Sequence, residues 1–386
     1  SVRPHPMSKP VRYHGLDLLR GVAMALGVVL HAPLAFITPE IWEAVDVPWY
    51  EVPKTEDWVL MLLGWIHQWR MPAFFLLAGF FGLMILRRRG ALAFLGDRIV
   101  RLGLTLALFG LIIDAINLPI DFELEHLWFL YHLLMICGLA SAAFALSQAF
   151  PAVLVPLARA VAWPARHVAG LLLYLPLLLL LTINTRPPER TLIPHYLHEI
   201  EPLALAYNTL WFIIGAALYH HRDTIATLAK GWLLALSGVV AVASMMMFWG
   251  LAHQTYTVTT APLLLWLPSS TLATFSWALF MVGLATRLLK RRSRVVNWFV
   301  RVSYPVYVFH LQPSIWIGVI GLTTGVTAGA LLLPTIAISF ALSIALYYGF
   351  VYFTPLEWLF NGHKRAWFRP HWIGLGRKPA PPPRPD

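Results

Sequence analysis

The sequence predicts an all-α fold, a polytopic membrane helix bundle with about ten transmembrane helices and both termini in the cytoplasm. Of the 386 residues, 59% are hydrophobic and only 12% are charged, and the mean hydropathy is +0.67. Soluble globular chains do not have this composition. The apolar residues form segments long enough to cross a bilayer, which takes about 20 residues. Lys and Arg gather in alternate connecting segments, as expected for a chain that crosses a membrane repeatedly.

The predicted spans follow the apolar segments in chain order. We place them at residues 14–37, 57–87, 97–116, 126–149, 168–184, 203–220, 231–251, 269–288, 298–321 and 329–353. Segments after the even-numbered spans carry most of the 29 Lys and Arg. Basic loops stay in the cytoplasm, so this asymmetry places both termini there. We expect a cytoplasmic segment at 1–13, one transmembrane domain at 14–353 and a proline-rich cytoplasmic tail at 354–386.

Charge and cysteine content exclude several classes of function. The formal net charge is +11 at pH 7, but the basic residues lie in short loops rather than on one amphipathic face, so we expect no nucleic-acid partner. The single cysteine, Cys137, lies in an apolar run, which excludes a disulfide framework. His195 and His198 precede Glu199 without the helical spacing of a zinc-binding motif, so we predict no metal site.

The first predicted span carries three polar groups on one face. Asp17, Arg20 and His31 lie within an otherwise apolar segment. At about 100° per residue, Arg20 and His31 lie about 20° apart around a helix and roughly 16 Å apart along it. Each residue alone could be a packing or helix-end residue. Ionisable groups inside a membrane are costly and by default functional, so their shared face favours a functional path.

The second predicted span is longer than a bilayer requires and is interrupted near its middle. Pro72 closely follows His67 and Arg70. Because proline removes a backbone donor, we expect a kink or a re-entrant segment there. Arg70 lies about 18 Å along a helix from the start of the span, inside the membrane. The alternative is an extramembrane helix end. Gly79 and Gly82 predict close packing against another helix.

Two later spans carry further polar groups. The fourth span begins with His126 and Trp128 at the predicted outer face, where an aromatic belt would account for the tryptophan alone. In the ninth span, Ser303, Tyr307 and His310 fall within about 60° on one helix face. We expect His310 to reach the same depth as the polar groups of the first and second spans.

These segments resemble motifs of the acyltransferase-3 family of integral membrane acyltransferases. Residues 17–21 (DLLRG), with a histidine at position 31, are similar to the first-helix signature of the family. Residues 70–80 (RMPAFFLLAGF) are similar to its second-helix motif. Residues 126–130 (HLWFL) and 303–310 (SYPVYVFH) are similar to later motifs in the same order. The resemblance covers residues 12–352, nearly the whole chain.

The resemblance implies an acyl-CoA-dependent O-acyltransferase with its donor on the cytoplasmic side, a carbohydrate hydroxyl outside and a water-accessible passage between them. Under this hypothesis Arg20, Arg98 and Arg101 hold the donor phosphates, and Asp17 holds Arg20. His31 is the general base on the acceptor, with a covalent acyl-histidine as the alternative. The expected catalytic residues are His31, Asp17, Arg20 and His310.

The other motif residues are expected to bind the substrates. Arg70 and His310, with Tyr307, would stabilise the developing oxyanion or the distal carboxylate of a succinyl group. His126 and Trp128 would line the outer entrance for the sugar. The set of expected substrate-binding residues is completed by His67, Ser303 and Tyr304.

The form HQWRM at residues 67–71 most resembles the glucans biosynthesis protein C branch, which succinylates osmoregulated periplasmic glucans. It implies a multi-pass protein of the bacterial inner membrane that uses succinyl-CoA, with acetyl as the alternative, and a periplasmic glucan or other envelope polysaccharide. Ala78 and the pair Tyr131–His132 depart from the family pattern and leave the acyl group and the acceptor open. Whether the protein forms a homo-oligomer is also left open by the sequence. The alternative function is a transporter or flippase with a buried proton or sugar path.

Overall fold

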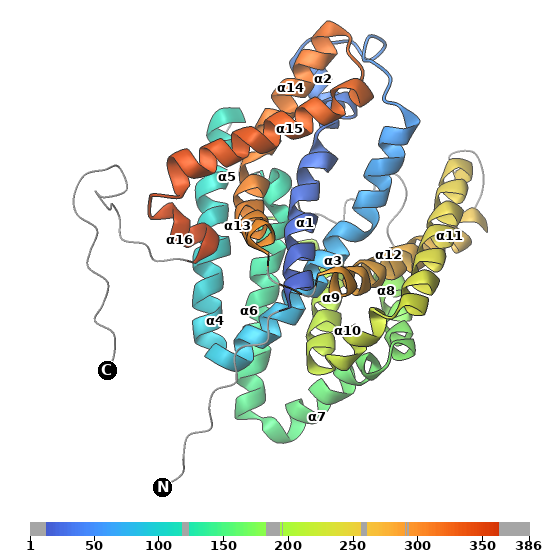
Figure 1. Ribbon diagram of the computed structural model, residues 1–386, viewed down its shortest axis with the longest axis vertical. Helices are drawn as coiled ribbons and strands as arrows, with labels where there is room; N and C mark the ends of the chain where they lie inside the picture. Colours follow the sequence, from blue (N-terminus) through green and yellow to red (C-terminus); the bar gives the residue numbers. More distant parts are fainter. Residues whose placement is uncertain are drawn as a thin grey trace.

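The computed structural model describes residues 13–117, 123–182, 194, 196–255, 261–289, 291 and 293–362. Within these residues the chain is helical, and its β pairing is limited to an isolated bridge between Glu123 and Tyr196. Figure 1 shows one bundle with α1 (His14–His31) near its middle. The predicted all-α class is confirmed.

Short connections join most of the helices. In chain order they are α1 (His14–His31), η1 (Leu34–Phe36), α2 (Pro39–Ala44), α3 (Asp57–Arg89), α4 (Ala91–Arg98), η2 (Ile99–Leu104), α5 (Thr105–Asn117), η3 (Glu125–Leu127), α6 (Trp128–Ala149), α7 (Pro151–Ala162), η4 (Trp163–Arg166), η5 (Ala169–Tyr174), α8 (Leu175–Thr182), α9 (Pro202–His220), α10 (Asp223–Leu228), α11 (Gly231–Thr255), α12 (Ala261–Leu288), α13 (Arg294–Phe309), α14 (Leu311–Thr324), α15 (Ala328–Leu346), η6 (Tyr347–Val351) and α16 (Leu356–Asn361). Of the η elements, η2 and η6 are π-helical and the others are 3-10 helices.

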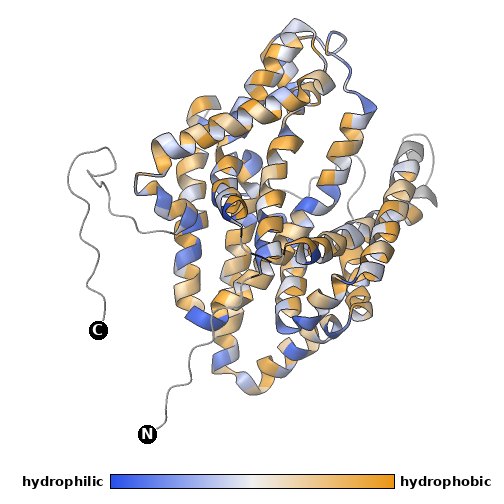
Figure 2. Ribbon diagram, in the orientation of Figure 1, coloured by the Kyte–Doolittle hydropathy of each residue, from blue (hydrophilic) through white to orange (hydrophobic). Residues whose placement is uncertain are grey.

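The described helices account for up to ten membrane crossings. Eight helical segments are each long and apolar enough to span a bilayer, and two helix pairs meet the same test only together. The second pair, α13 and α14, is bent by 59°. Figure 2 shows hydrophobic residues along most of the helical ribbon. These spans agree with the predicted polytopic bundle.

The other bent pair corrects the predicted span at 168–184. The chain forms α7 and η4 up to Arg166, then turns by 120° into η5 and α8. His167, between the two arms, has an extended backbone conformation that interrupts the helix. The apolar segment that begins at Ala169 is therefore one arm of a bent pair. Hydropathy alone gives no information about such a bend, because both arms are apolar.

Helix α3 is continuous over 33 residues, so the predicted kink or re-entrant segment at residues 67–72 is wrong. Pro72 cannot donate a hydrogen bond to the carbonyl of Gln68. The Gln68 side chain donates to the carbonyl of Ser270 at 2.8 Å and to the hydroxyl of Thr274, which ties α3 to α12 at this point. Packing against a neighbouring helix lets a proline remain in a membrane helix without a break.

Helices α3 and α9 approach closely through glycines on both sides. A Cβ atom on Gly79 would overlap the carbonyl of Phe212, and one on Gly215 would overlap the carbonyl of Leu76. A Cβ atom on Gly82 would lie 2.9 Å from the ring of Phe212. The predicted close packing at Gly79 and Gly82 is therefore confirmed.

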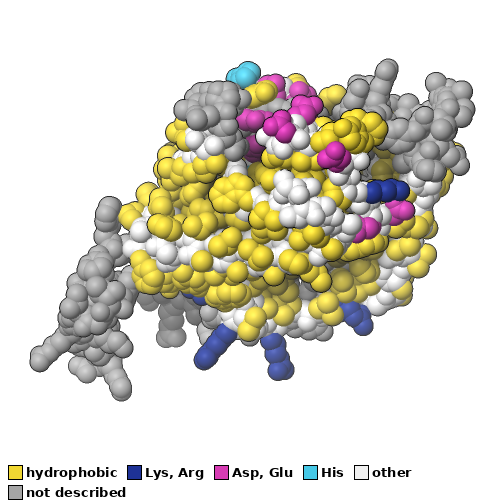
Figure 3. Space-filling model, turned by 90° about the horizontal axis from the view of Figure 1, so that it is seen from above, with side chains coloured by type: hydrophobic (Ala, Val, Ile, Leu, Met, Phe, Trp, Pro, Cys, Tyr) yellow, Lys and Arg dark blue, Asp and Glu magenta, His cyan; other side chains and the backbone are white. Residues whose placement is uncertain are grey.

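The surface divides by charge and hydropathy. Figure 3 shows Asp and Glu side chains toward the upper and right edges, hydrophobic side chains over a broad middle, and Lys and Arg side chains projecting mainly from the lower edge, with a further basic side chain beside the acidic ones at the right. Glu56 accepts hydrogen bonds from the hydroxyl of Thr327 at 2.6 Å and from the N–H of Gly329 at 2.8 Å. These bonds tie the start of α3 to the start of α15.

The predicted tail at 354–386 begins with a short helix that packs on the bundle. Helix α16 packs on the bundle through Phe360, which is fully buried and whose ring lies 5.2 Å from that of Tyr304 and 5.5 Å from that of Phe109. Arg101 Nη2 donates to the carbonyl of Phe360 at 3.0 Å. Packed helical structure therefore continues to Asn361. Residues 1–12 of the predicted segment 1–13, and residues 363–386 of the predicted tail 354–386, lie outside the described residues.

Candidate active site

Three histidine rings from distant parts of the chain meet inside the bundle. His31 Nδ1 lies 2.9 Å from His310 Nε2, and the two rings are stacked with centroids 5.0 Å apart and planes 5° apart. The ring of His126 lies edge-on to both, with centroids 6.2 Å from His31 and 5.3 Å from His310. His126 and His310 are buried. We call these three residues the imidazole cluster.

Breaks in two helices bring His31 and His310 together. Helix α1 ends at His31; Ala32 still has helical angles, and the backbone leaves the helical conformation at Pro33, with φ −91° and ψ 9°. His310 lies at the 59° bend between α13 and α14. Pro313 follows it and cannot donate to the carbonyl of Phe309, which promotes that bend. Both imidazoles therefore stand at helix ends inside the membrane domain.

The structure places His126 differently from the predicted outer entrance. It is buried, and its Nε2 donates to the carbonyl of Val308 at 3.3 Å. The residue before it, Glu125, has a φ of 43°, in the left-handed region, and the chain enters α6 through the short turn η3. Trp128 is half-buried, and its ring lies edge-on to that of His132 at 5.7 Å. His126 thus belongs to the imidazole cluster.

Hydrogen bonds assign the protonated nitrogen of each stacked ring. His310 Nδ1 lies 2.6 Å from the carbonyl oxygen of Tyr307, which can only accept, so this nitrogen carries the proton. A neutral His310 then accepts at Nε2, and His31 Nδ1 is the donor to it. The lone pair of His31 is therefore on Nε2. An imidazole oriented at one nitrogen and basic at the other has the arrangement of a general base.

Tyr307 contacts two members of the imidazole cluster. Its hydroxyl donates to the carbonyl of His126. Its ring lies 5.3 Å from that of His126 and 5.8 Å from that of His310. Tyr307 is buried, so these contacts fix the relative positions of two cluster members.

Arg70 is a buried cation beside the imidazole cluster. Its side chain is 6% exposed, and its Nε and Nη1 atoms have no hydrogen-bond partner among the described residues. The ion pairs of the described chain do not include it. A Cβ atom on Gly27 would lie 2.9 Å from Arg70 Nη1 and 3.5 Å from His310 Nε2, so the guanidinium and the ring share the space above this glycine. A charge buried without a counter-ion costs several kcal/mol, which an anionic ligand would offset.

A basic cavity lies at the other end of the polar face of α1. Its volume is about 580 Å³, within the range of small-molecule sites. The guanidinium side chains of Arg20, Arg98, Arg101 and Arg301 line it together with apolar residues. Arg20 lies 3.5 Å from Asp17, which is the predicted contact between these two residues. We call this space the basic cavity.

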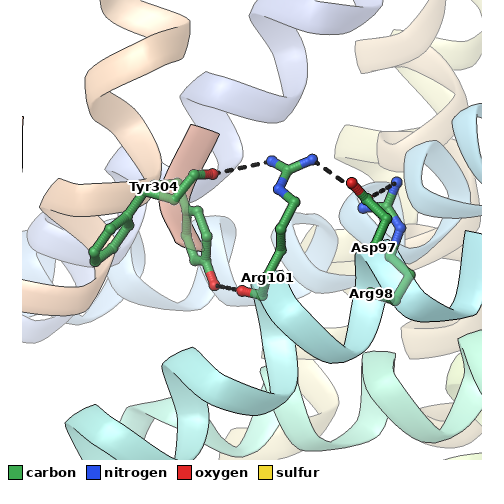
Figure 4. A network of polar contacts seen from close by, with 5 residues as sticks. Asp97, Arg98, Arg101 and Tyr304 are labelled. Carbon is green, nitrogen blue, oxygen red and sulfur yellow. Dashed lines mark hydrogen bonds and ion pairs between the residues drawn. The ribbon is translucent and has the colours of Figure 1, made fainter. Parts of the chain in front are cut away.

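One carboxylate serves two of these arginines. Asp97 lies 3.7 Å from Arg98 and 3.8 Å from Arg101, and Figure 4 shows it between them. The hydroxyl of Tyr304 donates to the backbone carbonyl of Arg101 at 2.7 Å. The backbone here is the π-helical η2, and π-helical turns are frequent at functional sites. Because the cations outnumber Asp97, the cavity keeps an excess of positive charge.

An aromatic wall separates the basic cavity from the imidazole cluster. Phe74 lines the cavity, and its ring contacts that of Phe129 at 4.8 Å. The ring of Phe129 contacts that of Tyr307 at 4.9 Å, and Tyr307 contacts the cluster. The described lining of the cavity does not include His31. The cavity therefore does not reach His31, and the rings of Phe74, Phe129 and Tyr307 form a line of contacts between the cavity and the cluster.

The remaining predicted residues are His67, Ser303 and Tyr304. His67 is exposed on α3. Ser303 is buried, and its hydroxyl donates to the carbonyl of Val300 at 2.9 Å within its own helix. Tyr304 supports the basic cavity. No group of three His, Cys, Asp or Glu in the described chain could hold a metal ion, and His195 lies outside it.

Sequence reasoning missed three polar residues of the cavity. Arg301, Asn297 and Asn361 line it. Arg301 stands two residues before the motif at 303–310. As a basic residue near a predicted membrane face, it gives information only about topology. Asn361 falls in the predicted tail, so hydropathy gave no signal for it.

The fold and site define a multi-pass membrane protein that has a basic cavity and an imidazole cluster in which His126 and His310 are buried and His31 is half-buried. The acyltransferase-3 family, described as "Acyltransferase domain", matches residues 13–352, which is most of the chain. The chain belongs to this family and is a membrane acyltransferase. No curated protein and no solved structure matches it.

Proposed function

We propose that this protein transfers an acyl group from cytoplasmic acyl-CoA to a hydroxyl of an envelope carbohydrate in the inner membrane of a bacterium. Succinyl and a periplasmic glucan are the favoured pair, and acetyl and another polysaccharide are the alternatives. The observation that carries the proposal is the unpaired Arg70 beside the His31–His310 pair. A base next to an unpaired cation suits a reaction that deprotonates an alcohol and develops charge on a carbonyl oxygen.

The basic cavity supports binding of the donor. Phosphate groups form charge-assisted, often bidentate bonds with guanidinium groups. Arg20, Arg98, Arg101 and Arg301 offer such groups around one space, with Asp97 shared between two of them. In this proposal the phosphates of acyl-CoA occupy this region, and its pantetheine arm extends toward Phe74.

The acyl arm must pass the aromatic wall to reach the base. Phe74 lies four residues after Arg70 on α3, a rise of about 6 Å. Along α3 the barrier is therefore about one helical turn thick, and the rings of Phe74 and Phe129 are the part of it nearest the cavity. In this proposal these rings rotate aside when the donor binds, which keeps the thioester from water until then.

In the proposed reaction, His31 moves one proton from the acceptor hydroxyl to the leaving thiolate. His31 Nε2 takes the proton of the acceptor hydroxyl as its oxygen attacks the thioester carbonyl, and Arg70 stabilises the resulting oxyanion. His310 accepts from His31 Nδ1 throughout, as the orienting group of a catalytic triad does. When the intermediate collapses, the carbon–sulfur bond breaks and the His31 imidazolium returns its proton to the thiolate. The products are an ester and free CoA.

A succinyl group would give Arg70 a second role. Its distal carboxylate is a counter-ion of the kind that Arg70 lacks in this structure. An acetyl group has no such charge. Succinyl transfer should therefore depend on Arg70 more steeply than acetyl transfer does.

The proposal is tested with purified protein in liposomes. Radiolabelled succinyl-CoA is supplied on one side with a β-glucan on the other, and label on the glucan is measured for the wild type and for His31→Gln. Transfer by the wild type and its loss in the variant are expected. A wild type that moves label to no carbohydrate, or glucan movement without any acyl-CoA, would overturn the proposal, and the second result would favour a transporter.

A further inference from the structure

The short helix α16 forms part of the wall of the basic cavity although it lies beyond the family match, which ends at residue 352. Its last residue, Asn361, lines the cavity together with Arg101 and Arg301. Arg101 also donates to the carbonyl of Phe360, which fixes the end of α16 beside the cavity. Membership of the family therefore assigns no role to this side of the cavity.

A buried carboxylate sets the orientation of Asn361. Glu357 is fully buried, and the ion pairs of the described chain do not include it. The hydroxyl of Tyr347 donates to Glu357 Oε2 at 2.9 Å. Asn361 Nδ2 donates to both oxygens of Glu357 at 3.3 Å and to the hydroxyl oxygen of Tyr347 at 3.2 Å.

These bonds decide which end of the amide is available to a ligand. The NH₂ end of an amide only donates, and the two carboxyl oxygens of Glu357 accept from it, so this is the end of Asn361 that Glu357 holds. The amide oxygen of Asn361 is left as an acceptor on a residue that lines the cavity. An acceptor beside four cations suits a ligand that carries both anionic groups and N–H donors.

We propose that Asn361 accepts a hydrogen bond from an N–H group of the nucleotide or pantetheine part of the donor, and that Glu357 is the positioning residue for it. This inference rests on the proposed function, because acyl-CoA is the donor named there. The cations bind the phosphates, whereas Asn361 recognises a neutral N–H group. Removing Asn361 should therefore weaken CoA binding without weakening binding of a bare polyphosphate.

The test compares two probes on the full chain in nanodiscs. Dissociation constants for CoA and for inorganic tripolyphosphate, which has no N–H group, are measured by calorimetry for the wild type, Asn361→Ala and Glu357→Gln. Loss of one neutral hydrogen bond predicts about three- to tenfold weaker CoA binding in Asn361→Ala, with tripolyphosphate unchanged. Glu357→Gln keeps the side-chain volume but can hold either end of the amide, so it should weaken CoA binding in the same selective way.

The controls separate this inference from the proposed function. Arg98→Ala should weaken both probes, and Arg88→Ala, an exposed residue of α3, should weaken neither. Equal CoA affinity in the wild type and Asn361→Ala, or parallel weakening of both probes, would overturn the role of Asn361. If Asn361→Ala does not fold, Glu357→Gln decides the same question. A wild type that binds no CoA would overturn the donor assignment itself.

Discussion

The rings of His31 and His310 lie nearly parallel, joined by one hydrogen bond of 2.9 Å between residues 279 positions apart in the chain. The bond is directional, because His310 Nδ1 already donates to the carbonyl of Tyr307. His31 is therefore the donor at Nδ1 and keeps a basic Nε2. This asymmetry gives the two histidines different roles, one as base and one as the group that orients it.

Replacing the base should remove turnover and leave the fold. His31→Gln should lower the rate of acyl transfer by about 10²- to 10⁴-fold, since this is the contribution of a positioned general base. His310→Gln should lower it less, because His31 keeps its lone pair but loses its orienting acceptor. Initial rates of label transfer measure the effect, and thermal melting checks the fold. Wild-type turnover in His31→Gln would refute its assignment as base.

Arg70 should lower the stability of the ligand-free protein and be required for acyl transfer. Arg70→Met keeps an extended side chain and removes a buried, unpaired charge. We expect the ligand-free variant to be more stable by about 1 kcal/mol, which melting in detergent would measure. Its transfer rate should fall sharply, and more for succinyl-CoA than for acetyl-CoA. A less stable variant with unchanged turnover would show that Arg70 serves packing.

Alanine substitutions at Gly27 and Gly79 should affect acyl transfer and folding differently. A Cβ on Gly27 would meet Arg70 and His310, which are side chains of the site, whereas a Cβ on Gly79 would overlap the backbone of Phe212. Gly27→Ala should therefore reduce transfer with a melting temperature near that of the wild type. Gly79→Ala, the matched variant, should lower the yield of folded protein. Size-exclusion profiles and initial rates distinguish the two outcomes, and full activity in Gly27→Ala would contradict the placement of Arg70.

Arg301 should contribute to donor binding as strongly as the predicted arginines. It lines the basic cavity, and among the described ion pairs it has no carboxylate partner. Arg301→Ala should raise the dissociation constant of CoA about tenfold or more, the effect of losing a charge-assisted bond. The affinity of the wild type should fall as salt is raised, and more steeply than that of the variant. Equal affinity and equal salt dependence would remove Arg301 from the site.

The contact between α3 and α15 should weaken in acid. The hydroxyl of Thr327 and the N–H of Gly329 stabilise the ionised carboxyl of Glu56 and hold its pKa below the usual value. A lowered pKa means that this stabilisation is fully present above the usual value and is lost as the pH falls through the lowered one. The melting temperature of the wild type should therefore drop more between pH 6 and pH 3 than that of Glu56→Gln. Identical pH profiles would exclude Glu56 as a contributor.

Part of the candidate site was predictable because membrane helices are regular. The rise and rotation of an α-helix place Asp17, Arg20 and His31 on one face, and the structure shows the Asp17–Arg20 contact. The low tolerance of bilayers for charge singled out Arg70. Its burial beside His310 agrees with the expected convergence of the second and ninth spans.

Other features depend on contacts that local patterns do not contain. The proline in α3 predicted a break, but hydrogen bonds from Gln68 to α12 accompany an unbroken helix. His126 is predicted at the outer entrance because it begins the fourth span, and a left-handed Glu125 precedes the turn that brings it into the imidazole cluster. The predicted tail starts where the last apolar span ends, and hydropathy gives no sign that Phe360 within it is buried.

By itself, the sequence determined that the chain is a helical membrane bundle, which groups it carries inside the membrane and how those groups lie along each helix. These properties follow from hydropathy and helical periodicity, which are local. Only the tertiary structure decided that His31 donates to His310, that the rings of Phe74, Phe129 and Tyr307 lie between cavity and cluster, and that Asn361 belongs to the cavity. Those relations join residues far apart in the chain, and they depend on helix bends and packing that no local pattern encodes.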